Sequence, residues 1–341
     1  MSTTYPDELK IRWYKQKYYL DQGFLKPIIG GRRDEYNPFD LYKQGNRAFD
    51  SLHFKFADLN LKDDTAIESF YSRYGPLGFF NREILKVVSY NPSLTHLFKL
   101  PNSSPVAGVH RFSDELIPMD DLIDKFHIPT SKLPIPNEND VVMPISEISS
   151  FDTWESVDEF KRECASFKMI VDFRHAVAKQ NYPLIRKILL ENCSNPDEIR
   201  SYDNGQLLAN ANFFIIAYVN TELDNMVSPC LDFDQSSLGI SKNITWRCNS
   251  LLTALYMMLF VDITRGASTC RCSNEKCRRR FEPVKPGTKY CCPSCQTTAK
   301  TRRSRKKSEV VSLWSQGKSP EEISNIINID INQIKQWIEV N

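Results

Sequence analysis

The residues best suited to chemistry in this chain of 341 residues are its cysteines, six of which lie between Cys270 and Cys295. Four of these form two close pairs, Cys272-x4-Cys277 and Cys291-x3-Cys295, with thirteen residues between the pairs. Structural zinc takes four tetrahedral ligands, and thiolates both neutralise its charge and bind it strongly. Two short-range pairs joined by a hairpin supply such a site at little cost in chain entropy. The spacing predicts a structural zinc site with the ligands Cys272, Cys277, Cys291 and Cys295.

The second cysteine pair leaves one alternative open, because Cys292-x2-Cys295 is also a common zinc spacing. We favour Cys291 over Cys292 and expect Cys270 not to be a ligand. An iron–sulfur cluster also takes four thiolates and is the competing cofactor. Buried thiols without a metal are the simplest alternative, but such thiols do not cluster among Arg and Lys side chains.

The residues around the cysteines predict a small α+β layout. Residues 280–282 and 288–290 are strand-like arms, and Pro286-Gly287 is a turn signal between them. Pro293-Ser294 then begin a helix that extends to about residue 306. This is the layout of a treble-clef finger, in which a knuckle supplies the first ligand pair and a helix start supplies the second.

This finger resembles the CGNR-type zinc fingers at the C-terminus of a bacterial family of transcription regulators. In that family a largely helical domain precedes the finger, and residues 74–78 (YGPLG) resemble a short motif of some members. Gln296-Thr297-Thr298 stand where the name-giving motif has Gly-Asn-Arg. The resemblance implies a DNA-binding regulator, and it rests on Cys272, Cys277, Phe281, Tyr290, Cys291, Cys295, Ala299, Lys300, Arg302 and Arg303.

Positive charge is concentrated in the same segment. Residues 270–307 contain thirteen Lys and Arg but two Glu, a net charge of +11; because the whole chain carries +2, the remainder carries −9. A run of charge is usually a solvated face, but this run has few compensating acids and adjoins a zinc finger. It predicts a phosphate-binding surface. The candidate nucleic-acid contacts there are Arg278, Arg279, Arg280, Lys300, Arg302, Arg303, Arg305, Lys306 and Lys307.

The last 34 residues have the sequence pattern of a tri-helical helix-turn-helix unit, similar to the tri-helical domains of resolvases and sigma factors. We expect three helices in this unit. The first covers residues 309–316, the second begins at the capped start Ser319-Pro320, and the third follows a turn at residues 328–330. A small core is predicted from Val310, Leu313, Trp314, Ile323, Ile327, Ile329, Ile334, Trp337 and Ile338.

The third helix of this unit is the candidate reader of DNA sequence. Its outward residues are predicted to be Asn332, Gln333, Lys335 and Gln336, and Asn and Gln suit bidentate bonds to adenine in the major groove. Residues 308–341 nevertheless carry two Lys against five acids, a net charge of −3. Binding of a protein instead of DNA is therefore the alternative for this unit.

The elements upstream predict a mainly α protein. We expect an irregular region at 1–63, a mainly helical sensing or oligomerisation domain at 64–265, a zinc finger with its basic helix at 270–307, and the helix-turn-helix-like domain at 308–341. Within the second region, periodicity predicts helices over 64–74, 153–179, 182–190, 206–226 and 244–263, with a short hairpin over 230–240. Frequent prolines predict loops over 91–150.

Enzymatic chemistry is not indicated. The five histidines are scattered, and no Ser/His/Asp arrangement or Gly-rich phosphate loop is recognisable. The N-terminus lacks the apolar core of a secretory signal, and the longest apolar run, at 251–261, is too short to span a bilayer. We expect a cytoplasmic protein without a membrane partner, whose clustered cysteines bind metal and do not form disulfides.

Together these features predict a zinc-dependent DNA-binding protein, a transcription regulator whose helical domain binds a ligand or protein partner or forms a homo-oligomer. Two alternatives remain: an RNA-binding protein, since zinc knuckles and Arg-rich helices also serve RNA, and an enzymatic N-terminal domain that the C-terminus tethers to nucleic acid.

Overall fold

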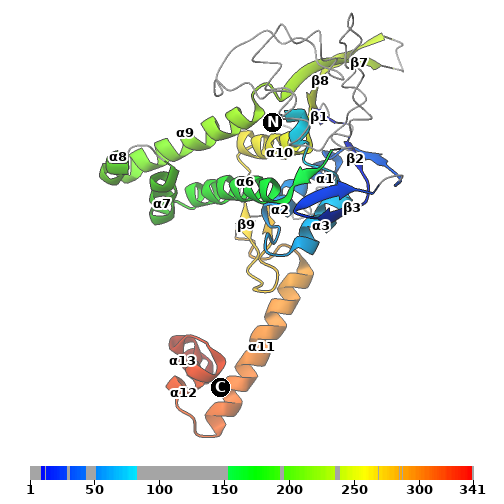
Figure 1. Ribbon diagram of the computed structural model, residues 1–341. Coiled ribbons are helices and arrows are strands. Elements are labelled where there is room, and N and C mark those ends of the chain that lie inside the picture. Colours follow the sequence, from blue (N-terminus) through cyan, green and yellow to red (C-terminus); the bar gives the residue numbers. More distant parts are fainter. Residues whose placement is uncertain are drawn as a thin grey trace, which may run out of the picture. The chain divides into compact units, whose positions relative to one another are not determined.

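The computed structural model describes residues 9–43, 51–82, 153–234, 239–283 and 285–339, apart from 12, 29, 30, 193–195, 268 and 286. The chain divides into two compact units, Met1–Ser268 and Thr269–Asn341, which we call unit 1 and unit 2. The described residues are mainly helical, as predicted (Figure 1). The predicted loop region at 91–150 lies outside the described residues.

Unit 1 is built on packed helices. Figure 1 shows α6, α9 and α10 side by side, and α7 packs against α6 and α9. No helix in the described ranges has the length and apolar composition needed to cross a bilayer. The helices of unit 1 are α1 Asp40–Lys43, α2 Leu52–Ala57, α3 Asp64–Tyr74, α6 Val157–Ala178, α7 Tyr182–Asn192, α8 Pro196–Ser201, α9 Asn204–Leu223 and α10 Leu251–Thr264.

Local signals explain several helix boundaries. The Asp63 carboxylate accepts hydrogen bonds from the N–H groups of Thr65 and Ala66 at the start of α3, and α3 has the predicted bounds. The Ser156 hydroxyl caps α6, whose buried stripe includes Phe160, Phe167 and Val171. This stripe joins α6 to the core because residues three and four apart share one face of a helix.

The described residues of unit 1 also form three small sheets. In the first, β1 (Leu9–Lys10) pairs in parallel with β8 (Gly239–Cys248), which pairs antiparallel with β7 (Val227–Asp234). The second is the antiparallel pair β2 (Trp13–Lys15) and β5 (Asp34–Tyr36). The third joins β3 (Tyr18–Asp21), β4 (Phe24–Pro27) and β6 (Glu155–Ser156).

The prediction of an irregular region at 1–63 is wrong for the described residues. They contain β1–β5, and Leu9, Trp13 and Leu25 are buried in the same core as the helices. The strands have two to four residues, so they show no useful alternation, and two of them pair with residues more than 100 positions away.

Two predicted helices begin at least four residues later in the structure, and the helix predicted over 206–226 is α9, Asn204–Leu223. The helix predicted over 244–263 begins at Leu251, after a Ser250 cap, because the residues before it form β8. The helix predicted over 153–179 begins at Val157, because Glu155 and Ser156 pair with β4. The hairpin predicted over 230–240 is longer in the structure, as β7 and β8, and residues 235–238 between these strands lie outside the described residues.

The Glu155 carboxylate organises the interior of unit 1. The side chain is 1% exposed and accepts hydrogen bonds from the N–H groups of Leu77 (3.0 Å), Gly78 (2.8 Å) and Phe79 (3.0 Å), and from the Tyr71 hydroxyl. Burial raises its pKa to about 8, while the three N–H groups favour the ionised form and oppose that shift. The carboxylate thus satisfies the backbone donors of a buried loop.

Two glycines let this loop approach its neighbours. Gly75 and Gly78 have φ angles of 86° and 85°, in the left-handed region that favours glycine. A Cβ atom would lie 2.3 Å from the Tyr14 carbonyl oxygen at Gly75 and 2.7 Å from the Ser250 Cβ at Gly78. The motif at residues 74–78 therefore has a packing role.

Unit 2 contains two short strands and three helices. Strands β9 (Cys270–Arg271) and β10 (Arg280–Phe281) form an antiparallel pair, and α11 (Pro293–Ser315), α12 (Pro320–Ile327) and α13 (Ile331–Glu339) follow. The basic helix and the first helix of the tail, predicted as separate, are one helix of 23 residues. Helix α11 runs through the expected domain boundary at 307/308, because no glycine or proline interrupts it there.

The three helices enclose a small core at the C-terminal end of α11, where α12 and α13 fold back (Figure 1). The N-cap Ser319 and Glu322 form the predicted capping box. The core prediction is wrong for Trp314, which is 46% exposed. It is confirmed for Val310, Leu313, Ile323, Ile327, Ile329, Ile334, Trp337 and Ile338.

Replacing the central carboxylate should destabilise unit 1. In Glu155→Gln an amide N–H₂ would face backbone N–H donors and leave some of them unpaired, which should cost on the order of 3 kcal/mol. Urea denaturation measures the decrease in stability. Glu191→Gln on the exposed side of α7 is the control and should match the wild type. Equal stabilities of the two variants would show that the fold does not depend on this carboxylate.

Candidate metal centre

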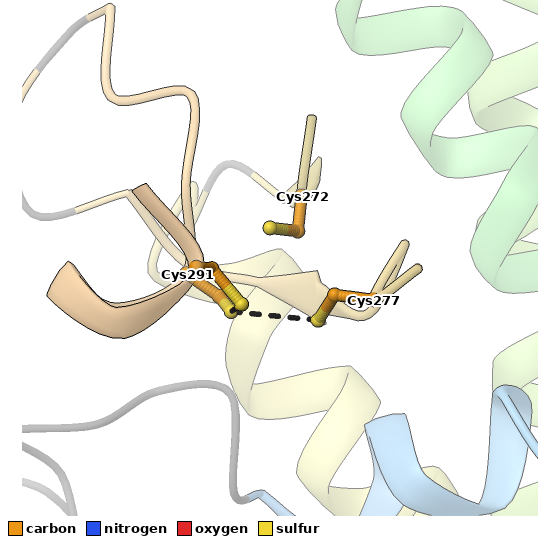
Figure 2. Close-up of side chains that lie close together, drawn as sticks. Cys272, Cys277 and Cys291 are labelled. Carbon is orange, nitrogen blue, oxygen red and sulfur yellow. Dashed lines mark hydrogen bonds between the residues drawn. The ribbon is translucent and has the colours of Figure 1, made fainter. Parts of the chain in front are cut away.

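Four cysteine side chains converge in unit 2. The sulfur atoms of Cys272, Cys277, Cys291 and Cys295 all lie within 4.8 Å of one another. Figure 2 shows Cys272, Cys277 and Cys291 directed toward a common space from separate parts of the chain. Cys272 is buried and the other three are half-buried. The structure therefore brings together the four predicted ligands, and this group can hold a metal ion.

The spacing of the sulfur atoms fits tetrahedral coordination. The Cys291 Sγ lies 3.7 Å from the Cys277 Sγ and 3.6 Å from the Cys295 Sγ. Four sulfurs at a metal–sulfur distance of about 2.3 Å stand roughly 3.8 Å apart at the corners of a tetrahedron. A disulfide would require about 2.05 Å. The cluster is therefore a set of free thiols with the dimensions of a four-coordinate site.

The first ligand pair is positioned by a tight turn at Asn274. The buried Asn274 accepts hydrogen bonds at its carbonyl oxygen from the N–H groups of Cys277 (2.8 Å) and Arg278 (3.0 Å). The Cys272 N–H donates to the Arg279 carbonyl oxygen at 2.9 Å, which closes the loop at the end of the β9–β10 pair. Cys272 and Cys277 thus lie at the two ends of one knuckle.

The second ligand pair is positioned by the start of α11. Cys292 is the N-cap, Pro293 follows it, and Cys295 lies in the first turn. Proline suits this position because it lacks an N–H that would have no partner there. Cys291 and Cys295 therefore stand on either side of the helix start, as the spacing predicted.

The electrostatics of the cluster favour a cation. Burial tends to raise the pKa of Cys272, but hydrogen bonds from the N–H groups of Cys291 and Asn274 lower it. Burial and the nearby sulfurs of Cys295 and Cys277 raise the pKa of Cys291, and burial raises the pKa of Cys295 to about 11. Adjacent thiolates repel one another, so a bound cation is what allows all four thiols to ionise.

The two neighbouring cysteines lie outside the group of four. The Cys292 Sγ is 3.9 Å from the Cys291 Sγ, and the N–H group of Cys295 lowers the pKa of Cys292. Cys270 lies in β9. Cys291, and not Cys292, thus completes the cluster that can hold a metal.

One predicted arm of the finger is absent. Residues 288–290 do not form a strand, and β10 pairs with β9, with Arg280 opposite Arg271 and Phe281 opposite Cys270. A hydrogen bond from the Ser273 N–H to the Lys289 carbonyl oxygen, at 2.8 Å, ties the second segment to the knuckle.

The predicted nucleic-acid contacts divide by exposure. Arg280 is 2% exposed in β10 and has no accessible surface for a phosphate. Arg302 is half-buried, with its Nη1 3.0 Å from the Glu275 Oε2. Lys306 and Lys307 are also half-buried. The exposed members are Arg278, Arg279, Lys300, Arg303 and Arg305.

Helix α13 presents most of its predicted polar residues to solvent. Asn332, Lys335 and Gln336 are exposed, whereas Gln333 is half-buried. On the opposite side, the buried Trp337 ring lies beneath the Arg303 guanidinium, 6.0 Å from its centroid. The basic part of α11 and the helix α13 therefore contact each other directly.

A buried histidine–carboxylate pair in unit 1 was not recognisable in the sequence, because His53 and Asp262 are 209 residues apart. The His53 Nε2 lies 3.0 Å from the Asp262 Oδ2, the Ser51 hydroxyl lies 2.8 Å from the His53 Nδ1, and the Tyr42 hydroxyl donates to the Asp262 Oδ1 at 2.8 Å. Burial tends to raise the pKa of Asp262, but His53 and Tyr42 lower it. All four side chains are buried, so this network holds α1, α2 and α10 together and cannot reach a substrate.

Comparisons with protein-family models, curated proteins and solved structures give no match to this chain. The resemblance to CGNR-type fingers therefore rests on the finger residues alone. The interpretation of the site depends on its own geometry.

The cluster predicts one metal ion per chain. Cys277→Ser and Cys295→Ser should release it, because three thiolates bind a structural metal far more weakly than four, and the β9–β10 region should then become protease-sensitive. Elemental analysis by plasma mass spectrometry measures the content and identifies the metal. Cys270→Ser and Cys292→Ser are matched controls that should keep it. Full metal content in the Cys295 variant would refute the site.

Proposed function

We propose that unit 2 is a zinc-dependent DNA-binding module and that the protein is a transcription regulator. The support comes from three features of the unit: a site of four thiols, an exposed basic helix surface, and a three-helix end with exposed amide side chains.

Zinc is the metal that this donor set favours. Four thiolates in tetrahedral spacing suit Zn²⁺, which has no redox chemistry and no demand on geometry beyond four ligands. The surrounding fold offers little else to stabilise it, since Cys272 and Phe281 are the buried apolar side chains between residues 269 and 309 of the described chain. Cys272, Cys277, Cys291 and Cys295 would hold the ion, and the ion would supply the stability that a core supplies elsewhere.

The exposed basic residues support binding to a polyanion. Lys300, Arg303 and Arg305 lie on α11, and Arg278 and Arg279 follow the knuckle that holds the first ligand pair. Lys and Arg at this density neutralise phosphates and release counterions, which gives affinity for any nucleic acid. Phosphate contacts of this kind also orient a protein on the duplex.

The contact between Arg303 and Trp337 carries the proposal. It places the basic surface of α11 against α13, whose Asn332, Lys335 and Gln336 face solvent. The αL conformation of Asn328 (φ 54°) makes a tight connection between α12 and α13, as in helix-turn-helix units. Phosphate-binding and base-reading groups can then act on one stretch of duplex, with α13 in the major groove.

Removing exposed cations should weaken binding to every duplex. Lys300→Ala with Arg305→Ala should lower affinity for specific and scrambled DNA alike, and should reduce the slope of log affinity against log salt by about 0.9 for each phosphate that the protein no longer neutralises. Fluorescence anisotropy at several salt concentrations measures both effects. Lys168→Ala, an exposed lysine of α6 in unit 1, should leave them unchanged. An unaltered slope in the double variant would show that this surface does not bind phosphates.

Removing one exposed amide should affect the preferred sequence alone. After selection of a preferred duplex from a random pool, Gln336→Ala should cost about 1–3 kcal/mol on that duplex and nothing on a scrambled one. The exposed Gln316 at the end of α11 supplies the control, Gln316→Ala. Structured RNA is included as a competitor. If RNA displaces the duplex at equal concentration, the RNA-binding alternative is the better one.

Protein docking by the three-helix end is the second candidate function. Trp314 and Ile326 are 46% and 53% exposed, and the unit's tail is acidic. Large exposed apolar side chains mark protein contacts more often than DNA contacts. If Gln336→Ala behaves as the wild type on both duplexes, this candidate replaces base reading, and the basic surface alone binds nucleic acid.

A further inference from the structure

Helix α9 in unit 1 has an unusual surface. Residues 204–221 contain no charged side chain, although α9 is a helix of 20 residues at the margin of unit 1, with α6 and α10 on one side (Figure 1). The exposed positions of α6, by contrast, include Asp158, Arg162 and Lys168. A helix that faces solvent normally covers its outer side with charge. The outer side of α9 is therefore suited to contact with another protein surface.

One face of α9 already has its contacts. Leu207, Ala211, Ile215 and Val219 recur every four residues, are at most 4% exposed, and pack into the core of unit 1 against α6, α7 and α10. Leu208, Phe214 and Tyr218 are partly buried against the same core, whereas Phe213 and Ile216 are not part of it. Phe213 is 72% exposed and Ile216 is 52% exposed, which are two of the three largest exposures among the large apolar side chains of the described chain.

The exposed residues form a stripe with the spacing of a helix-pairing seam. Gln206, Ala209, Phe213, Ile216 and Asn220 follow one another at intervals of three, four, three and four residues, and all are exposed. We call these five residues the α9 stripe. Apolar residues at alternating intervals of three and four are the pattern by which one helix packs along another. The occupant that fits the α9 stripe is therefore a helix.

We propose that the occupant is α9 of a second copy of this chain, packed antiparallel about a two-fold axis. The intervals from Ala209 to Asn220 are symmetric about the midpoint between Phe213 and Ile216. An axis at that point places Phe213 against Ile216 of the second copy, and Ala209 against Asn220 of the second copy. Large side chains then meet at the centre, and small or polar ones meet toward the ends.

Self-association also fits the charge of the surface. In a two-fold interface each group meets the same patch of the other copy, so a charged stripe would bring like charges together. The residues that flank the stripe, Asn212 and Ala217, are exposed and uncharged as well. A partner recognised through charge would find no complementary group on residues 204–221 of α9. The contact thus makes a homodimer through unit 1, and this inference does not rest on DNA binding.

Two single substitutions test the contact on the full-length protein. Sedimentation equilibrium from about 1 to 100 µM should show a dimer for the wild type. Phe213→Lys and Ile216→Glu should each weaken the dimer by at least about 100-fold, because a two-fold interface contains each side chain twice and burial of each is worth tenfold or more. Both positions are exposed, so circular dichroism should show intact folds. Tyr19→Lys, 43% exposed in β3, which lies away from α9 in Figure 1, is the control and should stay dimeric.

Mixing the two variants tests the antiparallel arrangement. In the mixed dimer Lys at 213 faces Glu at 216, and Ile216 of the first chain faces Phe213 of the second, so association should return to within about 10-fold of the wild type. A parallel pair would place Lys opposite Phe and would not recover. The proposal is overturned if the wild type is monomeric throughout, if either single variant remains dimeric, or if the mixture stays monomeric.

Discussion

The crowding of four sulfur atoms is the constraint on which unit 2 depends. Thiols within 4.8 Å of one another cannot all ionise without a cation, and the residues around them bury too little apolar surface to hold the knuckle and the helix start together. A bound metal would resolve both problems at once. It would also fix the first turn of α11, a helix that extends without interruption to the three-helix end.

Unit 1 depends on buried polar groups of another kind. Glu155 accepts hydrogen bonds from three backbone N–H groups of the loop at residues 75–79. The Asp262 carboxylate is hydrogen-bonded to Tyr42 and His53, which joins α1, α2 and α10. Both carboxyl groups are buried with their hydrogen bonds made, which is the condition under which a buried polar group is tolerated. Arg174 also donates to the carbonyl oxygens of Asp262 and Ala267, which ties the end of α10 and the last residues of unit 1 to α6. These networks are structural, since their members have little or no contact with solvent.

The two units have opposite surface character. Unit 2 concentrates exposed Lys and Arg near its thiol cluster, whereas α9 of unit 1 carries a stripe without charge. Charge suits association with a polyanion and gives affinity that falls with salt, while an uncharged apolar stripe suits association with a like surface. A protein that dimerises through one unit and binds DNA through the other would present two basic units to one duplex. The linked pair would then bind more tightly than one unit alone.

The sequence by itself determined the features that depend on a few neighbouring residues. The cysteine spacing identified the four clustered sulfurs, and a capping signal identified the start of α12. Helical periodicity identified α3 and most of the core around Trp337. Only the tertiary structure showed which residues pair or become buried across long separations. Strands β1 and β4 take their partners from β8 and β6, Arg280 is buried although it lies in a basic run, and His53 meets Asp262. The α9 stripe was also not recognisable in the sequence, because a helix without charged residues from 204 to 221 shows little contrast between its faces. Caps and ligand pairs are set by local geometry, whereas strand pairing and burial are set by parts of the chain that meet only after folding.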